Sequence, residues 1–202
     1  MSKFILGKKL GMTTIYDNGK EAQNVTLVEC GAQVSLIRTE EKDGYSAIQL
    51  EMQKTKNKKA TKEFRTEKTE LKVGDKIGVD IFEIGEKVKV SGIAKAKGFQ
   101  GVVKRHGFKG SAKTHGHKHD LRAPGSIGAG YPEHVIKGKR MAGRMGGERA
   151  SSQNLKVAFI DKEKNIIGVK GAVPGVVGRV VEIYSKWIYE HTNSTKIRKF
   201  KK

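Results

Sequence analysis

Residues 136–149 combine basic side chains with glycine in a pattern that suits contact with phosphate groups. The segment reads I-K-G-K-R-M-A-G-R-M-G-G-E-R. An arginine guanidinium is a planar fork that pairs with phosphate and stacks on bases, and glycine lets a backbone approach a phosphate closely. Because almost nothing in the segment could fill a hydrophobic core, we expect it to fold only against a polyanion.

Three alternating histidines offer a second kind of chemistry. On a β-strand His115, His117 and His119 would face the same way, and such a set could hold zinc and activate water for phosphodiester cleavage. Asp120 is the one carboxylate close to them in the sequence, and the surrounding cations would repel a metal ion. Imidazoles near phosphates and ribose hydroxyls explain the same residues more simply, so we favour an RNA contact over a metalloenzyme.

The sequence lacks other recognisable catalytic arrangements. Its serines lie outside any nucleophile-elbow motif, its single cysteine, Cys30, has no histidine partner in a known motif, and residues 125–130 do not form a phosphate loop. We therefore expect a protein that is not an enzyme, with no catalytic residue, metal, cofactor or small-molecule substrate.

The net charge indicates a polyanionic partner. The 202 residues could form one domain or two small ones, and they include 41 lysines and arginines against 21 acids, a net charge of +20. Such an excess repels itself in a compact state unless a polyanion such as nucleic acid neutralises it. No apolar run of about 18 residues is present, which disfavours a membrane partner. The single cysteine and the lack of a secretory apolar run lead us to expect a cytoplasmic protein.

The basic residues are concentrated in the middle and at the end of the chain. Residues 95–149 hold 13 lysines and arginines against 3 acids, together with 12 of the 25 glycines. Residues 186–202 hold 6 lysines and arginines against 1 acid. In the central stretch we predict one helix over residues 98–106, with Phe99, Val102, Val103 and His106 on one face. A short connector with incidental charge is the alternative.

The flanking sequence has the pattern of short antiparallel strands. Its segments are rich in β-branched residues, often alternate, and are separated by turn signals. The expected strands are residues 12–16, 25–28, 34–37, 47–52, 77–82, 88–90, 155–160, 166–169 and 180–184. We predict a mainly β fold in which residues 1–94 and 153–185 form an antiparallel β-barrel. Residues 95–152 form a long irregular basic extension, residues 186–202 form a basic tail, and a few short helices complete the chain.

RNA is the favoured nucleic acid. Aromatic residues that could stack on single-stranded bases are few and widely spaced in the extension, namely Phe99, Phe108 and Tyr131, which favours recognition of backbone and shape. No helix-turn-helix, basic zipper or zinc-finger spacing supports DNA. A structural component of a ribonucleoprotein and a free RNA-binding translation factor or RNA chaperone both fit this pattern. The structural component should remain bound in moderate salt, because many phosphate contacts act together.

Six short motifs, in order, resemble the bacterial large-subunit ribosomal protein L3 family. They are G-K-K-L-G-M-T from residue 7, K-G-F-Q-G from residue 97 with K-R at 104, T-H-G from residue 114, R-A-P-G-S-I-G from residue 122, K-G-K-R-M-A-G from residue 137 and K-G-A-V-P-G from residue 170. The similarity extends from about residue 3 to residue 185. Each motif alone is weak, but six in register are specific.

The resemblance implies a barrel of the translation-protein type and a structural role in the large ribosomal subunit. It implies binding near the 3′ end of large-subunit rRNA of the bacterial 23S type, an early role in subunit assembly, and the proteins L14 and L19 as neighbours. It also implies that the extension is directed toward the peptidyl-transferase centre, with Arg144, Met145 and Gly146 at its innermost tip.

We expect rRNA contacts from the basic residues, histidines and adjoining residues of these motifs. The predicted contact residues are Lys8, Lys9, Lys97, Lys104, Arg105, His106, Lys109, Lys113, His115, His117, Lys118, His119, Arg122, Ser126, Lys137, Lys139, Arg140, Met141, Arg144, Met145, Arg149 and Lys170.

The sequence departs from the family pattern at several places. Arg144 stands where many bacterial relatives have a side-chain-methylated glutamine, so a fixed cation replaces that modification. A further family segment is missing after Lys62, which leaves residues 57–68 as a short polar arm. Leu121 stands where relatives often have histidine. Residues 187–202 extend past the usual end and read equally well as a short contact helix or a frayed tail.

Overall fold

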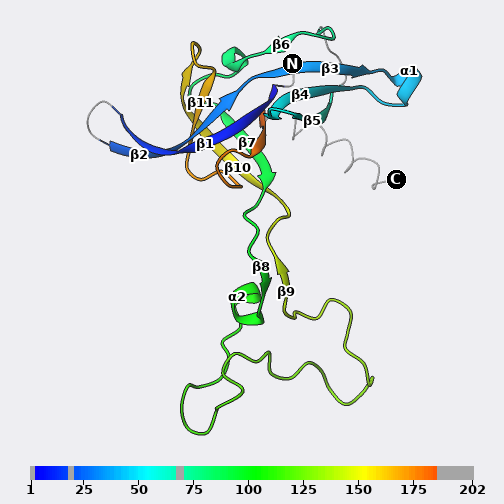
Figure 1. Cartoon of the computed structure of the whole chain (residues 1–202), viewed down its shortest axis with the longest axis vertical. Coiled ribbons are helices and arrows are strands. Elements are labelled where there is room, and N and C mark those ends of the chain that lie inside the picture. The colour runs from blue at the N-terminus through cyan, green and yellow to red at the C-terminus, as the bar shows by residue number, and fades with distance from the viewer. Residues whose placement is uncertain (1–2, 18–20, 67–70, 186–202) are drawn as a thin grey trace, which may run out of the picture. The chain divides into compact units, whose positions relative to one another are not determined.

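The computed structural model describes residues 3–17, 21–66 and 71–185 (Figure 1). The expectations for residues 187–202 lie outside the described residues. The chain divides into two compact units, one made of residues 1–94 and 149–202 and the other of Lys95–Glu148. The larger unit thus takes its chain from both sides of the smaller, central one.

Six strands of the larger unit close into a barrel. In barrel order they are β1 (Phe4–Asp17), β12 (Val180–Ser185), β7 (Lys87–Ile93), β10 (Arg149–Asp161), β11 (Ile166–Lys170) and β2 (Glu21–Cys30). All neighbouring pairs are antiparallel. Closure lets each strand satisfy its backbone on both sides, which removes the exposed edges that an open sheet would present. The predicted mainly β fold is confirmed.

The central unit is inserted between two barrel strands that pair with each other. In the β7–β10 ladder Ile93 lies opposite Arg149, and Ser91 lies opposite Ser151. The insertion therefore occupies the place of a hairpin turn. Strand β10 begins at Arg149, so residues 149–152, which the sequence pattern assigned to the extension, belong to the barrel ladder instead. Small polar residues in this stretch concealed the strand, because they give no alternation of apolar and polar side chains.

A second sheet lies outside the barrel. Its order is β5-β4-β3-β6, with bounds Lys58–Arg65, Ala47–Thr55, Ala32–Arg38 and Lys76–Ile77. The strands predicted at 34–37 and 47–52 are therefore in this sheet. The strand predicted over 77–82 is wrong beyond Ile77, because Val79–Ile81 forms the 3₁₀ helix η1. The short helix α1 (Glu40–Asp43) ends at Gly44, whose φ of 75° is the left-handed conformation that glycine adopts readily.

Strand β5 replaces the polar arm predicted over residues 57–68. Its side chains are mostly exposed, but that of Phe64 is buried. The ring of Phe64 stacks on Phe4 at a centroid distance of 4.4 Å and meets the edge of Tyr184 at 5.2 Å. A strand with one buried aromatic among charged residues has too little alternation to be recognised from sequence.

One hydrophobic core joins the barrel and the second sheet. Ile5, Ile167 and Ile183 of the barrel and Leu50 of β4 are fully buried in the same cluster. Burial of one such side chain contributes about 1.5–3 kcal/mol. None of the residues in this cluster comes from the central unit, so the barrel core is complete without it.

The central unit has three short elements at its base. They are β8 (Gly98–Gln100), α2 (Val102–His106) and β9 (Gly143–Met145), which Figure 1 shows close together. The predicted helix over 98–106 therefore begins late: Phe99 lies on β8 with 76% of its surface exposed, whereas Val102 is buried at the start of α2. The helix ends at Gly107, which has a left-handed φ of 73°.

We predict that Phe64→Ala destabilises the larger unit by about 3–5 kcal/mol, the usual cost of emptying a buried phenylalanine site. Urea unfolding of the purified chain measures the change. The matched control is Phe99→Ala, which should change stability by less than about 0.5 kcal/mol because its ring is exposed. Equal losses for the two variants would show that the Phe4–Phe64 stack is not part of the core.

Candidate nucleic-acid interface

A two-stranded ribbon forms the base of the central unit. Strands β8 and β9 pair antiparallel, with Phe99 opposite Arg144 and Gly98 opposite Met145. The amide of Lys97 donates to the carbonyl of Met145 at 2.9 Å, which extends the ladder toward the ends of the unit. The pairing places Arg144 beside the first residues of the central unit, and its predicted position near the peptidyl-transferase centre stays a prediction. Its strand is held by residues 97–100. We call the paired residues 97–100 and 143–145 the stem of the central unit, and Arg144 lies in it.

Helix α2 fixes the strand that returns to this stem. Nη1 of Arg105 donates to the carbonyl oxygen of Met141 at 2.7 Å, and Nε2 of His106 lies 3.1 Å from the same oxygen. A Cβ at Gly143 would lie 2.7 Å from Nη1 of Arg105, so the guanidinium would have to shift if residue 143 carried a side chain. Arg105 and His106, which the sequence assigned to rRNA contact, thus position the backbone of the central unit. The guanidinium keeps further N–H donors for a phosphate.

The distal part of the central unit is exposed. Between Ala112 and Arg140 every residue except Ala123 is exposed. Predicted contact residues Lys113, Lys118, Arg122, Ser126, Lys137, Lys139 and Arg140 all lie here. With no helix or strand in this stretch, its side chains are displayed to solvent and are available to phosphates.

The three histidines do not share a strand. His115 has a φ of 61° and precedes Gly116 with a φ of 86°, so the chain turns at this point. All three side chains are exposed. Among the described residues no group of three or more His, Cys, Asp or Glu side chains is arranged to hold a metal ion. The geometric premise of a zinc site, one face of a strand, therefore fails.

Lys9 differs from the other predicted contact residues because it is buried. Its Nζ donates to the carbonyl oxygens of Val173 at 2.7 Å and Gly175 at 3.1 Å, and only 7% of its surface is exposed. The neighbouring backbone is tied as well, since the amide of Gly178 donates to the carbonyl of Lys9 at 2.7 Å. The ammonium thus organises the β11–β12 loop, and the expectation of an rRNA contact through Lys9 is corrected.

Arg149 is the first barrel residue after the central unit, and it is ion-paired. Its Nη2 donates to Oε2 of Glu182, which also accepts from the Tyr184 hydroxyl at 2.9 Å. Nζ of Lys62 lies 3.3 Å from the other carboxylate oxygen. Burial opposes ionisation of the Glu182 carboxyl, but the hydrogen bonds from Arg149 and Tyr184 outweigh it and lower its pKa. This cluster joins β12, β10 and β5.

The remaining predicted residues lie on the surface to different degrees. Exposed residues are Lys97, Lys104, Lys109, Arg144 and Lys170; Lys8, Met141 and Met145 are half-buried. Both methionines use their backbone carbonyls within the central unit. The sequence did not identify the internal roles of Lys9, Arg105 and His106, because composition cannot show whether a cation will find carbonyl partners within the chain.

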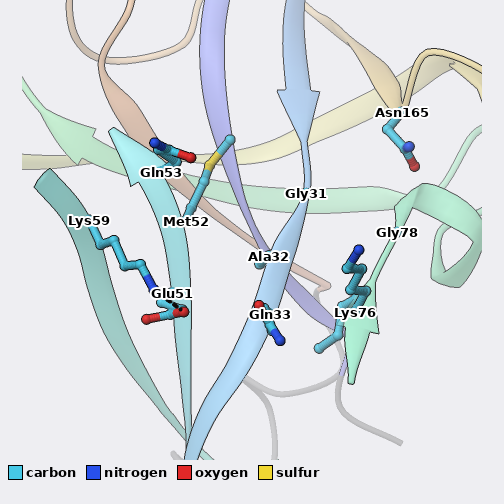
Figure 2. Close-up of a pocket in the computed structure, with 11 residues that line it drawn as sticks. Gly31, Ala32, Gln33, Glu51, Met52, Gln53, Lys59, Lys76, Gly78 and Asn165 are labelled. Atoms are coloured by element: carbon cyan, nitrogen blue, oxygen red, sulfur yellow. Dashed lines mark hydrogen bonds and ion pairs between the residues drawn. The ribbon is translucent and has the colours of Figure 1, made fainter. Parts of the chain in front are cut away.

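A hollow of about 390 Å³ opens where the barrel meets the second sheet (Figure 2). In it Nζ of Lys59 is ion-paired with Oε1 of Glu51 at 2.8 Å, as the dashed line in Figure 2 marks. The amide nitrogens of Gln33 and Gln53 donate to the backbone carbonyls of Gly74 and Lys56. No His, Cys or Ser lies among the residues that line this hollow.

These features define a class of protein. An exposed irregular segment rich in cations, in a chain whose barrel has its own core, is typical of nucleic-acid-binding proteins. Among the described residues no helix is long and apolar enough to cross a membrane.

Comparison with known proteins defines the class further. Residues 17–167 match the family model described as Ribosomal protein L3. The chain is 43% identical over 203 residues to large ribosomal subunit protein uL3 of Roseiflexus sp. (strain RS-1), covering 91% of this chain and 97% of the relative. It is 45% identical over 199 residues to the uL3 protein of Herpetosiphon aurantiacus, covering 89% and 94%. The uL3 protein of Renibacterium salmoninarum is 46% identical over 200 residues, covering 89% and 91%.

The chain belongs to the ribosomal protein L3 family. The resemblance found in the sequence motifs is thereby confirmed. The relatives carry the printed name of a ribosomal protein, which is not the name of an enzyme.

We predict that Gly146→Ala opens the stem of the central unit. Gly146 has a φ of 71°, and a Cβ there would lie 2.1 Å from the backbone oxygen of Lys95. Hydrogen exchange at the Lys97 amide, which is bonded to Met145, should become faster in the purified chain. The control is Gly138→Ala, where φ is 83° but no atom lies within 4 Å of the new Cβ. If hydrogen exchange at the Lys97 amide were unchanged in Gly146→Ala, the close approach of Gly146 to Lys95 would not be needed for the pairing in the stem.

We predict that Glu182→Gln lowers the stability of the larger unit at neutral pH. Because the folded pKa of Glu182 is lowered, its contribution is present above the unfolded carboxyl value of about 4.3 and is lost as the pH falls through the folded value. The difference in unfolding free energy between the two chains should therefore narrow below about pH 4. Urea unfolding at several pH values measures it, with Glu29→Gln at an exposed barrel position as control. If the difference in unfolding free energy stayed constant with pH, the Glu182 carboxylate would not stabilise the fold in its ionised form.

Proposed function

We propose that this chain is a structural component of the large ribosomal subunit that binds large-subunit rRNA mainly through its central unit. The observation that carries this proposal is the long exposed basic stretch between Ala112 and Arg140 in a member of the ribosomal protein L3 family. The relatives' printed name, large ribosomal subunit protein, supports the assignment to that subunit and to the cytoplasm where ribosomes work.

The proposed binding is electrostatic with local positioning. Each cation that neutralises a phosphate releases condensed counterions, and several such contacts make binding strong but dependent on salt. Ordering a free backbone costs about 1–2 kcal/mol per residue, which RNA contacts must offset in the distal part. The β8–β9 ribbon and the Arg105 contact reduce this cost, because they hold both ends of the exposed stretch before RNA binds.

The finer features follow the family resemblance. We propose that the barrel is of the translation-protein type, that the chain binds near the 3′ end of 23S-type rRNA early in assembly, and that L14 and L19 are its neighbours. The central unit as a whole is proposed to extend toward the peptidyl-transferase centre. Arg144 on the stem is exposed and offers RNA a fixed cation. Many bacterial relatives have a side-chain-methylated glutamine at this position, where this chain has arginine.

We predict that the triple variant Lys137→Ala, Lys139→Ala and Arg140→Ala weakens binding to large-subunit rRNA. With three phosphate contacts removed, the slope of log affinity against log salt should fall in magnitude by about 2–3. Titration of rRNA with the full chain at several salt concentrations measures the slope. The control is Lys54→Ala, Lys56→Ala and Lys58→Ala, an equal change of charge at exposed positions around the β4–β5 turn.

Two outcomes would overturn the proposed function. One is an equal loss of slope in both triple variants, which would mean that charge acts without regard to position. The other is rRNA binding that depends on salt to the same degree in the distal variant as in the original chain. A chain that dissociates from intact large subunits in moderate salt would instead indicate a free RNA-binding factor.

A further inference from the structure

The distal part of the central unit folds around a hollow of about 550 Å³. The residues that line it include Phe108, Lys109, His117, Asp120 and Pro124. The lining is mixed, with one aromatic residue among polar and small ones, and a hollow of this size has room for a small planar ligand. Within an RNA-binding segment, the planar groups at hand are the bases of unpaired nucleotides.

Backbone contacts hold the two walls of this hollow together. The amide of Ser111 donates to the carbonyl oxygen of Leu121 at 3.2 Å. Gly110 has a φ of 75°, and a Cβ there would lie 2.4 Å from the same oxygen. The amide of Ala123 donates to the carbonyl of Asp120 at 3.1 Å, which turns the chain beside the hollow. Glycine at 110 thus permits the close crossing that defines the site.

Phe108 supplies a stacking surface that helix α2 fixes in place. The residue follows Gly107, whose amide donates to the carbonyl of Val103 at 3.0 Å. The ring of Phe108 is half-buried and lies 6.1 Å from that of His106, which is itself held at the Met141 carbonyl. A ring positioned in this way can stack on a base with little further loss of freedom.

Asp120 is the unusual residue of the hollow. It is one of three acids among residues 95–149, and an acid weakens attraction to phosphates. Its carboxylate is exposed and has no hydrogen bond or ion pair with any other residue that the structure describes. A carboxylate accepts only, so its partner must present N–H donors. Guanine presents two adjacent donors, N1–H and N2–H, to the two oxygens, whereas each other base presents one donor group.

We propose that this hollow binds one unpaired guanine of rRNA, with the base stacked on Phe108 and its donor edge on Asp120. Lys109 then lies beside the hollow for the phosphate of the same nucleotide. This inference rests on the proposed RNA-binding function and adds base selectivity to contacts that otherwise read only backbone and shape.

The test measures binding of the full chain to RNA hairpins that are identical except for a single bulged G, A, C or U. The original chain should bind the bulged-G hairpin about tenfold more tightly than the others, the discrimination expected of a two-bond contact. Asp120→Asn should abolish this preference while binding to the other hairpins stays equal or strengthens, because a negative charge is removed. Glu133→Gln is the matched control, since it makes the same change of charge outside the residues that line the hollow, and should keep the preference.

Phe108→Ala is the second variant, and it should weaken binding to the bulged-G hairpin relative to a fully paired hairpin. A chain without preference for guanine, or a preference that survives Asp120→Asn, would overturn the inference. Neither result would affect the proposed function, which predicts salt-dependent binding to every hairpin, including the fully paired one. Failure of the proposed function would instead appear as weak, salt-independent binding to all of them.

Discussion

The antiparallel pairing of β7 with β10 is the constraint on which the rest of the structure depends. It closes the barrel at the point where the chain leaves for the central unit and returns, with Gly92 opposite Ala150. The hydroxyls of Ser91 and Ser151 lie 2.7 Å apart across this ladder. Because the entropy of closing a loop grows only with the logarithm of its length, a long insertion costs little more than a moderate one. A barrel with its own core can therefore carry an exposed basic segment as the connection between two paired strands.

The cations of the larger unit and those of the distal stretch have different surroundings. Two cations of the larger unit that the sequence assigned to RNA have partners within it: Lys9 donates to backbone carbonyls, and Arg149 is paired with Glu182. Cations of the distal stretch, such as Lys137 and Arg140, are exposed in a region poor in acids. The cations of the distal stretch thus repel one another in a segment that contributes no residue to the hydrophobic core. In the proposed function, folding of the barrel and binding of rRNA therefore depend on different parts of the chain.

Sequence patterns predicted what depends on local alternation and failed where distant residues decide. Strand β4 was found because apolar and polar residues alternate in it, and β2 and β11 were found because β-branched residues dominate them. Strand β5 was missed because Phe64 alone gives its buried face, and its partners Phe4 and Tyr184 are distant in sequence. The sequence predicted the contact residues from their basic character, but it did not show which of them are exposed and which bind backbone carbonyls or carboxylates within the chain. Whether a cation binds within the chain depends on where backbone carbonyls lie in the folded protein, and a local sequence pattern does not show this.

The stem reduces the part of the central unit that must become ordered in the proposed binding to RNA. Composition alone suggests a segment that is shapeless until RNA surrounds it, and that view fits the exposed residues 126–140, which follow the hollow in the sequence. At the base, however, β8 and β9 pair, and Arg105 holds the carbonyl of Met141. An RNA site then needs to order only the stretch between these ties. The proposed selectivity for one base also depends on groups that are in position before RNA binds. Phe108 meets this condition because it directly follows Gly107, the cap of α2.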